Sequence, residues 1–169
     1  MSIIVEAMLS ELKQEAVATR RLLERVPGDK LAWKPHPKSM SLGQLALHVA
    51  SLPGAITDFL MNDHLVVDGV DFEPAAAKSS SELLPALEKS VAKANDFLGA
   101  LDEKRAMATW KLIKGGKEIL AAPRLMITRS LMLNHWYHHR GQLGVYLRQL
   151  NVSLPAVYGR SADENPLGL

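Results

Sequence analysis

The chain has 169 residues, 47% hydrophobic and 22% charged, a balance typical of a single globular domain that spans residues 1–169. Ordinary glycine and proline contents exclude collagen-like and low-complexity chains, and the absence of cysteine excludes disulfide frameworks, iron–sulfur clusters, thiolate zinc sites and cysteine nucleophiles. The net charge of +2, with no basic run and no nucleic-acid-binding motif, argues against a nucleic-acid partner.

The first predicted element is a long amphipathic helix over residues 2–26. Apolar side chains recur there at intervals of three or four residues, and most charged side chains lie off that stripe. Pro27 ends the helix, and a proline-containing loop follows. Ser41 is placed to cap the next helix, because Gln44 stands three residues later and completes a capping box. The second helix is therefore expected over residues 42–60.

The middle of the chain contains a predicted kink, a loop and a third helix. Pro53 lies inside the second helix, where it cannot donate a backbone hydrogen bond and is expected to cause a kink. Residues 62–78 are rich in Asp, Gly, Pro and small side chains and are predicted to form a connecting loop. A serine-rich cap at residues 79–82 then begins a helix that ends at Gly99.

A hairpin and a final helix complete the predicted elements. Two short runs between residues 110 and 120 flank Gly115-Gly116, a dipeptide typical of a tight hairpin turn. Pro123 suits the first position of a helix, and helical periodicity continues from there to about Leu150. Four long helices without an alternation of strands and helices predict an all-α fold, a four-helix bundle with a short β-hairpin before the last helix.

Two histidines of the last helix are spaced to bind the same metal ion. His135 and His139 are four residues apart, so their side chains lie one above the other and can bind one metal ion through ring nitrogens. On a helical wheel this face also carries Gln142 and Tyr146 and is largely inward. His138, three residues after His135, is an alternative ligand in place of His139.

A third histidine lies on the second helix. His48 shares an apolar stripe with Leu45 and Leu52, and burying an unpaired imidazole costs on the order of 1–3 kcal/mol. It therefore needs a hydrogen-bond acceptor or a metal. His48, His135 and His139 together match a catalytic metal site, in which three protein ligands leave an open position for water or substrate. Zinc, nickel and iron(II) all accept such ligands.

The remaining histidines and the acids limit the chemistry. His36 stands between prolines and His64 in an acidic loop, so both are expected to be solvated. Residues 123–150 contain no carboxylate, which excludes a metalloprotease-type motif with a glutamate base beside the metal. A bound metal would instead activate water, or hold a co-substrate thiol as its thiolate. The sequence identifies no catalytic side chain.

Four segments together resemble the DinB superfamily of metal-binding, DinB/YfiT-like four-helix bundles. They are Trp33-Lys34-Pro35, the run from Ser41 to Leu45 that leads to His48, the H-x-x-x-H-R-G-Q-L run from His135 to Leu143, and the tail from Pro155 to Glu164. The likeness spans nearly the whole chain. It implies metal ligands at His48, His135 and His139, the same three histidines.

The resemblance also implies a divalent ion, frequently zinc or nickel, a homodimer and, in some branches, transfer of a low-molecular-weight thiol such as bacillithiol or mycothiol. We therefore expect a metal-dependent enzyme, a thiol S-transferase or a hydrolase, that acts on a small-molecule substrate. The alternative is a non-catalytic, stress-associated bundle that binds a metal or another ligand. No apolar run approaches the roughly 18 residues of a spanning helix and no secretory signal is present, so a cytoplasmic protein without a membrane partner is expected.

Overall fold

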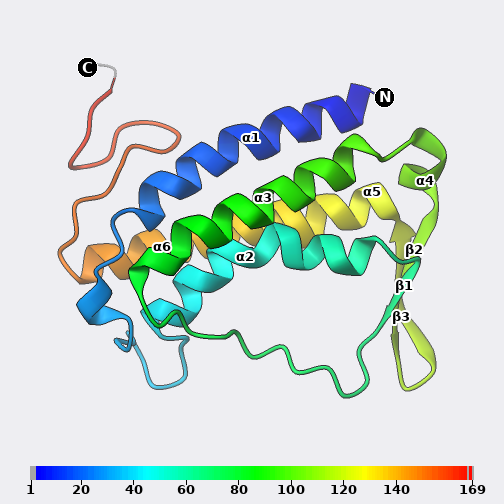
Figure 1. Ribbon diagram of the computed structural model, residues 1–169, viewed down its shortest axis with the longest axis horizontal. Coiled ribbons are helices and arrows are strands. Elements are labelled where there is room, and N and C mark those ends of the chain that lie inside the picture. The colour runs from blue at the N-terminus through cyan, green and yellow to red at the C-terminus, as the bar shows by residue number, and fades with distance from the viewer. Residues whose placement is uncertain (1–2, 167, 169) are drawn as a thin grey trace.

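A computed structural model describes residues 3–166 and 168, most of which are helical (Figure 1). The α-helices are α1 (Ile3–Leu23), α2 (Leu42–Leu60), α3 (Leu83–Gly99), α4 (Glu103–Met107), α5 (Arg124–Ile127) and α6 (His135–Gln149). Two 3₁₀ turns, η1 (Gly28–Lys30) and η2 (Ser80–Glu82), and a π-helical segment, η3 (Thr128–Asn134), join them. The strands are β1 (His64–Val66), β2 (Thr109–Lys114) and β3 (Lys117–Pro123).

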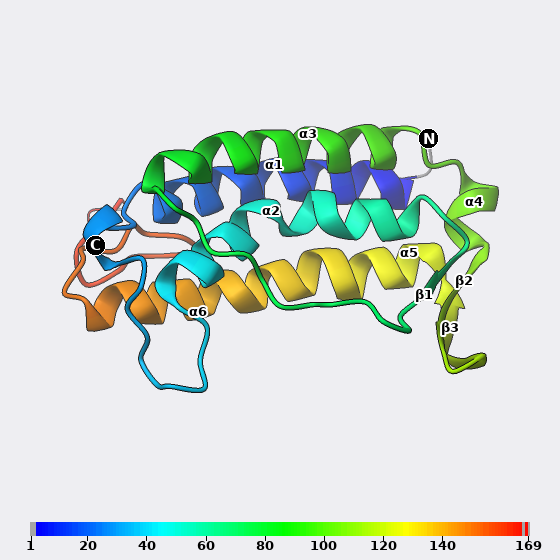
Figure 2. The same cartoon turned by 60° about the horizontal axis from the view of Figure 1, so that its bottom comes forward.

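The long helices lie side by side, and the small sheet lies at one end of them (Figures 1 and 2). α2 packs against α3 on one side and against η3 and α6 on the other, and α1 packs against α3. Their apolar faces meet in a shared core, whose fully buried side chains include Leu12, Leu45, Leu98, Met132 and Trp136. Within the described part of the chain, every helix is too short or too polar to cross a membrane.

The capping box predicted at Ser41 is confirmed, and it fixes the start of α2. Ser41 Oγ accepts a hydrogen bond from the backbone N–H of Gln44 at 3.1 Å, and Gln44 Oε1 accepts from the backbone N–H of Ser41 at 2.9 Å. Gln44 Nε2 also donates to the Pro74 carbonyl at 3.2 Å, which attaches the loop after β1 to this helix end. The position of His48 along α2 follows from this start.

α2 continues through Pro53, and the backbone groups near this proline bond to the neighbouring helices. Proline has no N–H, so the Val49 carbonyl one turn earlier loses its helical donor. The Trp136 indole donates to that carbonyl instead, at 2.8 Å. The N–H of Gly54 donates to Ser90 Oγ on α3 at 2.7 Å. The Pro-Gly pair thus fixes α2 against both α6 and α3.

The predicted isolated hairpin is wrong, because a third strand makes a mixed sheet with the order β1-β2-β3. β2 and β3 are antiparallel and meet at Gly115 and Gly116, whose positive φ angles of 56° and 70° suit a two-residue turn. β1 lies in the segment predicted as a loop and pairs parallel to β2, with Leu65 opposite Leu112. Three residues are too few to show an alternating pattern. The all-α prediction is therefore corrected to a mostly helical fold with a small mixed sheet.

The sheet is fixed to the C-terminal end of α2, where the last carbonyls of a helix lack intrahelical donors. The Trp110 indole donates to the Phe59 carbonyl at 3.2 Å. The buried Arg124 guanidinium donates to the carbonyls of Leu60 and Asn62 at 2.7 and 2.6 Å. Its positive charge also complements the negative end of the helix dipole. These contacts hold the strands in place relative to α2.

The predicted last helix, residues 123–150, consists of α5, η3 and α6 in continuous succession. Pro123 is the final residue of β3 and not the first residue of the helix, which begins at Arg124. η3 has the wider i→i+5 turn of a π-helix. A helical wheel drawn at 100° per residue therefore does not predict which residues before and after η3 share a face. The segment ends directly before His135, the first residue of α6.

Candidate metal centre

The three histidines predicted as ligands meet between α2 and α6. His135 and His139 stand one turn apart on α6, and His48 faces them from α2. One ring nitrogen from each side chain lies within 4.8 Å of the other two, and all three residues are half-buried. The ring centroids are 4.6 to 5.4 Å apart. The group is positioned to bind a metal ion.

Hydrogen bonds outside the group decide which nitrogens face one another. His139 Nδ1 lies 2.7 Å from Gln142 Oε1, an acceptor, so this nitrogen carries the proton. The His135 ring interacts with the backbone of Leu131, which opposes the lowering of its pKa by burial. The two Nε2 atoms are 2.8 Å apart. The tautomer of His135 decides whether this contact is a hydrogen bond or a pair of opposed lone pairs.

Burial and mutual proximity keep the imidazoles neutral. Burial, followed by the nearby rings of His139 and His135, lowers the pKa of His48 to about 4. Burial is also the main cause that lowers the pKa values of His135 and His139, with the neighbouring His138 acting in the same direction. A metal ligand must be the neutral imidazole. All three side chains are therefore in the ligating form near neutral pH.

The other histidines lie outside this group. His138, the alternative ligand, is exposed; its ring lies 4.9 Å from the His139 ring but is not among the converging nitrogens. His36 and His64 are exposed, as expected from the sequence. The buried stripe of α6, which includes Trp136 and Leu143, lies one residue beyond the histidine stripe. The histidines thus stand beside the core rather than in it.

The histidines line one part of a pocket of about 640 Å³. Its walls come from α2, the loop after β1, the three strands and the last helix, and most of them are apolar, including Leu52, Phe59, Phe72, Leu112 and Leu131. Apart from the histidines, Lys114 is the one ionisable residue of the lining, and no carboxylate takes part. A pocket of this size and polarity suits a small molecule.

Sequence reasoning missed most of this pocket. Phe72 and Pro74 come from the segment predicted to be a connecting loop, and Leu112, Lys114 and Ile119 come from the predicted hairpin. Their role depends on how the sheet packs against α2, which local periodicity does not report. Gln142 was recognisable as a candidate partner from its place on the histidine face.

A buried ion pair supports α6 directly behind His139. Arg140 is 3% exposed and pairs with Glu15 of α1 at 2.5 Å. The hydroxyl of Tyr158, from the C-terminal segment, donates to Glu15 Oε2 at 2.7 Å, and Arg140 also lies over the Tyr137 ring. This network ties α1, α6 and the C-terminal segment together on the side of α6 that faces α1.

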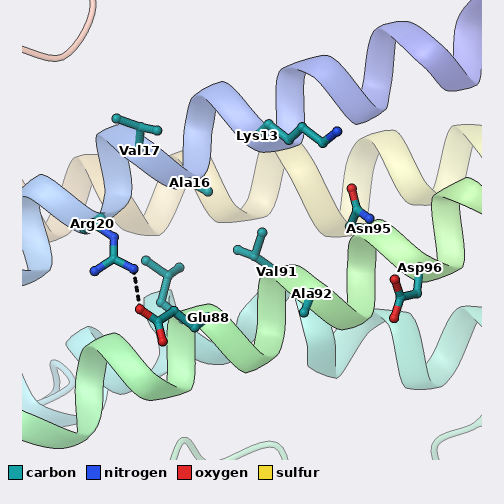
Figure 3. Close-up of a pocket in the computed structure, with 10 residues that line it drawn as sticks. Lys13, Ala16, Val17, Arg20, Glu88, Val91, Ala92, Asn95 and Asp96 are labelled. Carbon is teal, nitrogen blue, oxygen red and sulfur yellow. Dashed lines mark hydrogen bonds and ion pairs between the residues drawn. The ribbon is translucent and has the colours of Figure 1, made fainter.

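A second hollow, of about 440 Å³, lies between α1 and α3 (Figure 3). Figure 3 shows Arg20 reaching from α1 to Glu88 on α3, and these side chains pair at 2.6 Å. Lys13 and Asp96 are further charged members of its lining, which contains no histidine. This hollow therefore lacks the ligand chemistry of the histidine pocket.

Comparisons with known proteins agree with the fold. Residues 1–166 match the DinB family. The chain is 24% identical over 162 residues to the uncharacterized protein YrdA of Bacillus subtilis strain 168, which covers 95% of this chain and 91% of that protein. In fold it is similar to a DinB-like protein from Bacillus cereus (TM-score 0.70, 20% identity, 90% of this chain, 97% of that chain). It is also similar to the DinB-like protein YjoA from Bacillus subtilis (TM-score 0.69, 19% identity, 91% and 99%).

Proposed function

The chain belongs to the DinB family, and on this premise we propose that it is a metal-dependent enzyme that transfers a low-molecular-weight thiol to a small electrophilic substrate. The metal ligands in this proposal are His48, His135 and His139. Zinc or nickel is the proposed ion, and iron(II) would accept the same imidazole ligands.

The convergence of the ring nitrogens carries the proposal. The Nε2 atoms of His135 and His139 lie 2.8 Å apart, close enough for one cation to accept a lone pair from each ring. Three neutral histidines without a carboxylate among the pocket residues match a site that keeps a position for an exogenous ligand. A structural zinc site would more often have four protein ligands.

The chemistry divides between the ion and the chain. A divalent ion bound here supplies Lewis acidity, which lowers the pKa of a thiol or water molecule that joins it. The chain holds the ligands, and the hydrogen bond to Gln142 fixes the tautomer of His139. The apolar walls, including Leu52 and Leu131, exclude water and orient the electrophile.

The proposed reaction is a substitution at carbon. The thiol sulfur forms a bond to the electrophilic carbon, the leaving group departs with the electron pair of the bond that breaks, and the thiol proton passes to solvent. The chain has no cysteine, so the thiol is a second substrate and not a side chain. Bacillithiol and mycothiol are the first thiols to test.

We propose that the long helices, which lie side by side, form the four-helix bundle of this family, folded as one domain over residues 1–169. We also propose a homodimer. Light scattering on the eluted protein is expected to give twice the chain mass of 18.6 kDa, and a mass equal to that of one chain would reject the dimer.

Thiol consumption tests the proposed activity. The zinc- or nickel-loaded protein is mixed with bacillithiol or mycothiol and 1-chloro-2,4-dinitrobenzene, and formation of the thioether is followed by its absorbance. We expect turnover that His139→Ala abolishes and that His138→Ala, one residue away and exposed, leaves intact.

Two results would contradict this function. Turnover that persists after chelation, or in His139→Ala, would show that the histidine group is not the catalytic site. A metal-loaded protein whose melting temperature falls on chelation, but which transforms no thiol with any electrophile of a small panel, would support the non-catalytic, metal-binding alternative.

A further inference from the structure

The histidine pocket is elongated along α2. His48, Leu52, Ala55 and Phe59 all line it and recur at helical spacing on one face of that helix. At 1.5 Å per residue, the eleven-residue step from His48 to Phe59 covers roughly 16 Å. The Trp110 indole bonds to the Phe59 carbonyl, so the sheet closes the end of the pocket farthest from His48.

The two ends of the pocket differ in chemistry. One end carries the three imidazoles, and the sheet contributes Leu112, Ile119 and Lys114, the last residue of β2, to the other. The apolar stretch between them lacks polar side chains that a hydrophilic ligand would need. An extended apolar ligand would bury its chain along α2 between the two ends.

The charges near the sheet favour an anion. Lys111, also on β2, pairs with Glu118 at 2.5 Å, so these two charges neutralise each other. Asp68 accepts a hydrogen bond from the Gly115 N–H at 2.9 Å and does not line the pocket. Lys114 is thus the cation that the lining offers to a ligand, and no lining carboxylate opposes a negative group.

We propose that the pocket takes an elongated apolar substrate that carries an anionic group, such as a carboxylate, at the end remote from the histidines. Lys114 binds the anionic group, and the apolar faces of α2 and the sheet bind the chain. The reacting carbon then lies at the histidine end. The location of that carbon rests on the proposed function, whereas binding of the apolar anion does not.

The size of the pocket supports a small molecule as the occupant. Its volume of about 640 Å³ is within the roughly 300–1,000 Å³ of small-molecule sites. Phe72 is 58% exposed at its edge, on the extended segment that Gln44 attaches to α2 through the Pro74 carbonyl. A ligand beneath this segment would cover the aromatic ring.

Calorimetry on protein freed of metal with a chelator tests the binding. The probes are octanoate, decanoate, octanol and octylammonium, and removal of the metal prevents a carboxylate from binding an ion. We expect decanoate to bind about fifteenfold more tightly than octanoate, since each buried methylene contributes about fourfold. We expect octanoate to bind about threefold to fivefold more tightly than octanol, and octylammonium to bind most weakly.

Matched variants locate the two parts of the site. Lys114→Gln is expected to remove the preference for octanoate over octanol. Lys117 lies opposite Lys114 across the hairpin and does not line the pocket. Lys117→Gln is therefore expected to keep the preference for octanoate over octanol. Ala55→Trp, on the pocket wall but at an exposed position, is expected to weaken decanoate binding more than tenfold while the circular dichroism stays unchanged.

Equal affinities for octanoate and octanol, or a preference that survives Lys114→Gln, would overturn the assignment of an anion. Decanoate binding that Ala55→Trp leaves unchanged in the folded variant, or no saturable binding at all, would overturn the pocket assignment. Because these measurements need neither metal nor turnover, their failure is distinct from a failure of the thiol-transfer activity.

Discussion

Gln142 determines which nitrogen of His139 is free to bind. Its side-chain oxygen accepts from Nδ1 at 2.7 Å. A ligand with a fixed tautomer and ring orientation loses less freedom when it binds an ion. The residue types and the i, i+4 spacing predict this arrangement, because Gln142 lies three residues beyond His139 on the same face.

We therefore predict that Gln142→Ala lowers the affinity for zinc or nickel by about tenfold to 100-fold, the usual cost of removing an outer partner of a histidine ligand. Competition against a chelating dye measures the change. Gln149→Ala, at an exposed position near the end of α6, is the control and is expected to bind metal with unchanged affinity. Equal affinities in all three proteins would show that the hydrogen bond to Gln142 has no part in ligand orientation.

Stability of the metal-free protein is expected to depend on pH through the histidines. Their pKa values are lowered in the folded state, that of His48 to about 4 from an ordinary value of 6.5. Above about pH 6.5 both folded and unfolded chains hold neutral imidazoles. As the pH falls from about 6.5 to about 4, the unfolded chain binds protons that the folded chain does not, so the free energy of unfolding decreases.

Urea denaturation at several pH values measures this effect. The wild-type protein is expected to lose more stability between pH 7 and pH 4.5 than the triple variant His48→Ala, His135→Ala, His139→Ala, which lacks these groups. Acids such as Glu11, whose pKa is lowered through its contacts with Arg129 and Tyr137 against the opposing effect of burial, are present in both proteins. Identical slopes for the two proteins would contradict the lowered histidine pKa values.

At the scale of elements, α2 organises the site. It carries His48, forms one wall of the pocket and, through Pro53 and Gly54, makes hydrogen bonds to both α6 and α3. A Cβ built on Gly54 would lie 2.9 Å from Ser90 Cα, closer than such atoms approach. The glycine thus allows α2 and α3 to pack closely, and the backbone of α3 would have to move to accept a side chain there.

Gly54→Ala is accordingly predicted to destabilise the fold by about 1–3 kcal/mol, the usual cost of overpacking. Gly141→Ala, in α6 with no atom within 4 Å of the added carbon, is expected to raise stability by up to about 1 kcal/mol. Chemical denaturation of both variants measures the difference. A Gly54→Ala protein as stable as the wild type would show that the two helices are not held at this distance.

The sequence predicts the long helices and the candidate group of three histidines better than the features that surround that group. Strong local signals, such as the Ser41 capping box and the spacing of His135 and His139, are independent of the rest of the chain. β1 was missed because its pairing with β2 is parallel and its partner lies more than forty residues away. The π-helical η3 was missed because an i→i+5 turn leaves no clear mark on apolar periodicity. Tertiary packing sets both.

At the scale of the whole molecule, a buried polar network joins segments that are far apart in the chain. Glu15 of α1 pairs with Arg140 of α6, and Tyr158 bonds to Glu15. Farther along the C-terminal segment, Glu164 pairs with Arg21 and Arg25 at 2.5 and 2.6 Å. Two of the segments that resemble the DinB superfamily, the run from His135 to Leu143 and the tail from Pro155 to Glu164, are thus connected through α1. The network supports α6 on the side away from the pocket.

Glu15→Ala is predicted to destabilise the protein by about 3–5 kcal/mol, because it leaves the buried Arg140 charge without its partner. Glu88→Ala, which breaks the exposed pair with Arg20, is the control and is expected to cost less than about 1 kcal/mol. Thermal and urea unfolding give both values. Equal costs for the two substitutions would contradict the structural importance assigned to the buried pair.

The metal content of the protein tests the central claim most directly. We would purify the untagged wild type and the triple variant His48→Ala, His135→Ala, His139→Ala in parallel, incubate each with zinc, nickel or iron(II), remove free ions and measure bound metal by plasma mass spectrometry. We predict close to one divalent ion per wild-type chain and none in the variant, which stays helical by circular dichroism. A wild-type protein that binds none of the three ions, or a variant that binds as much as the wild type, would contradict the three-histidine metal centre and the activity proposed for it.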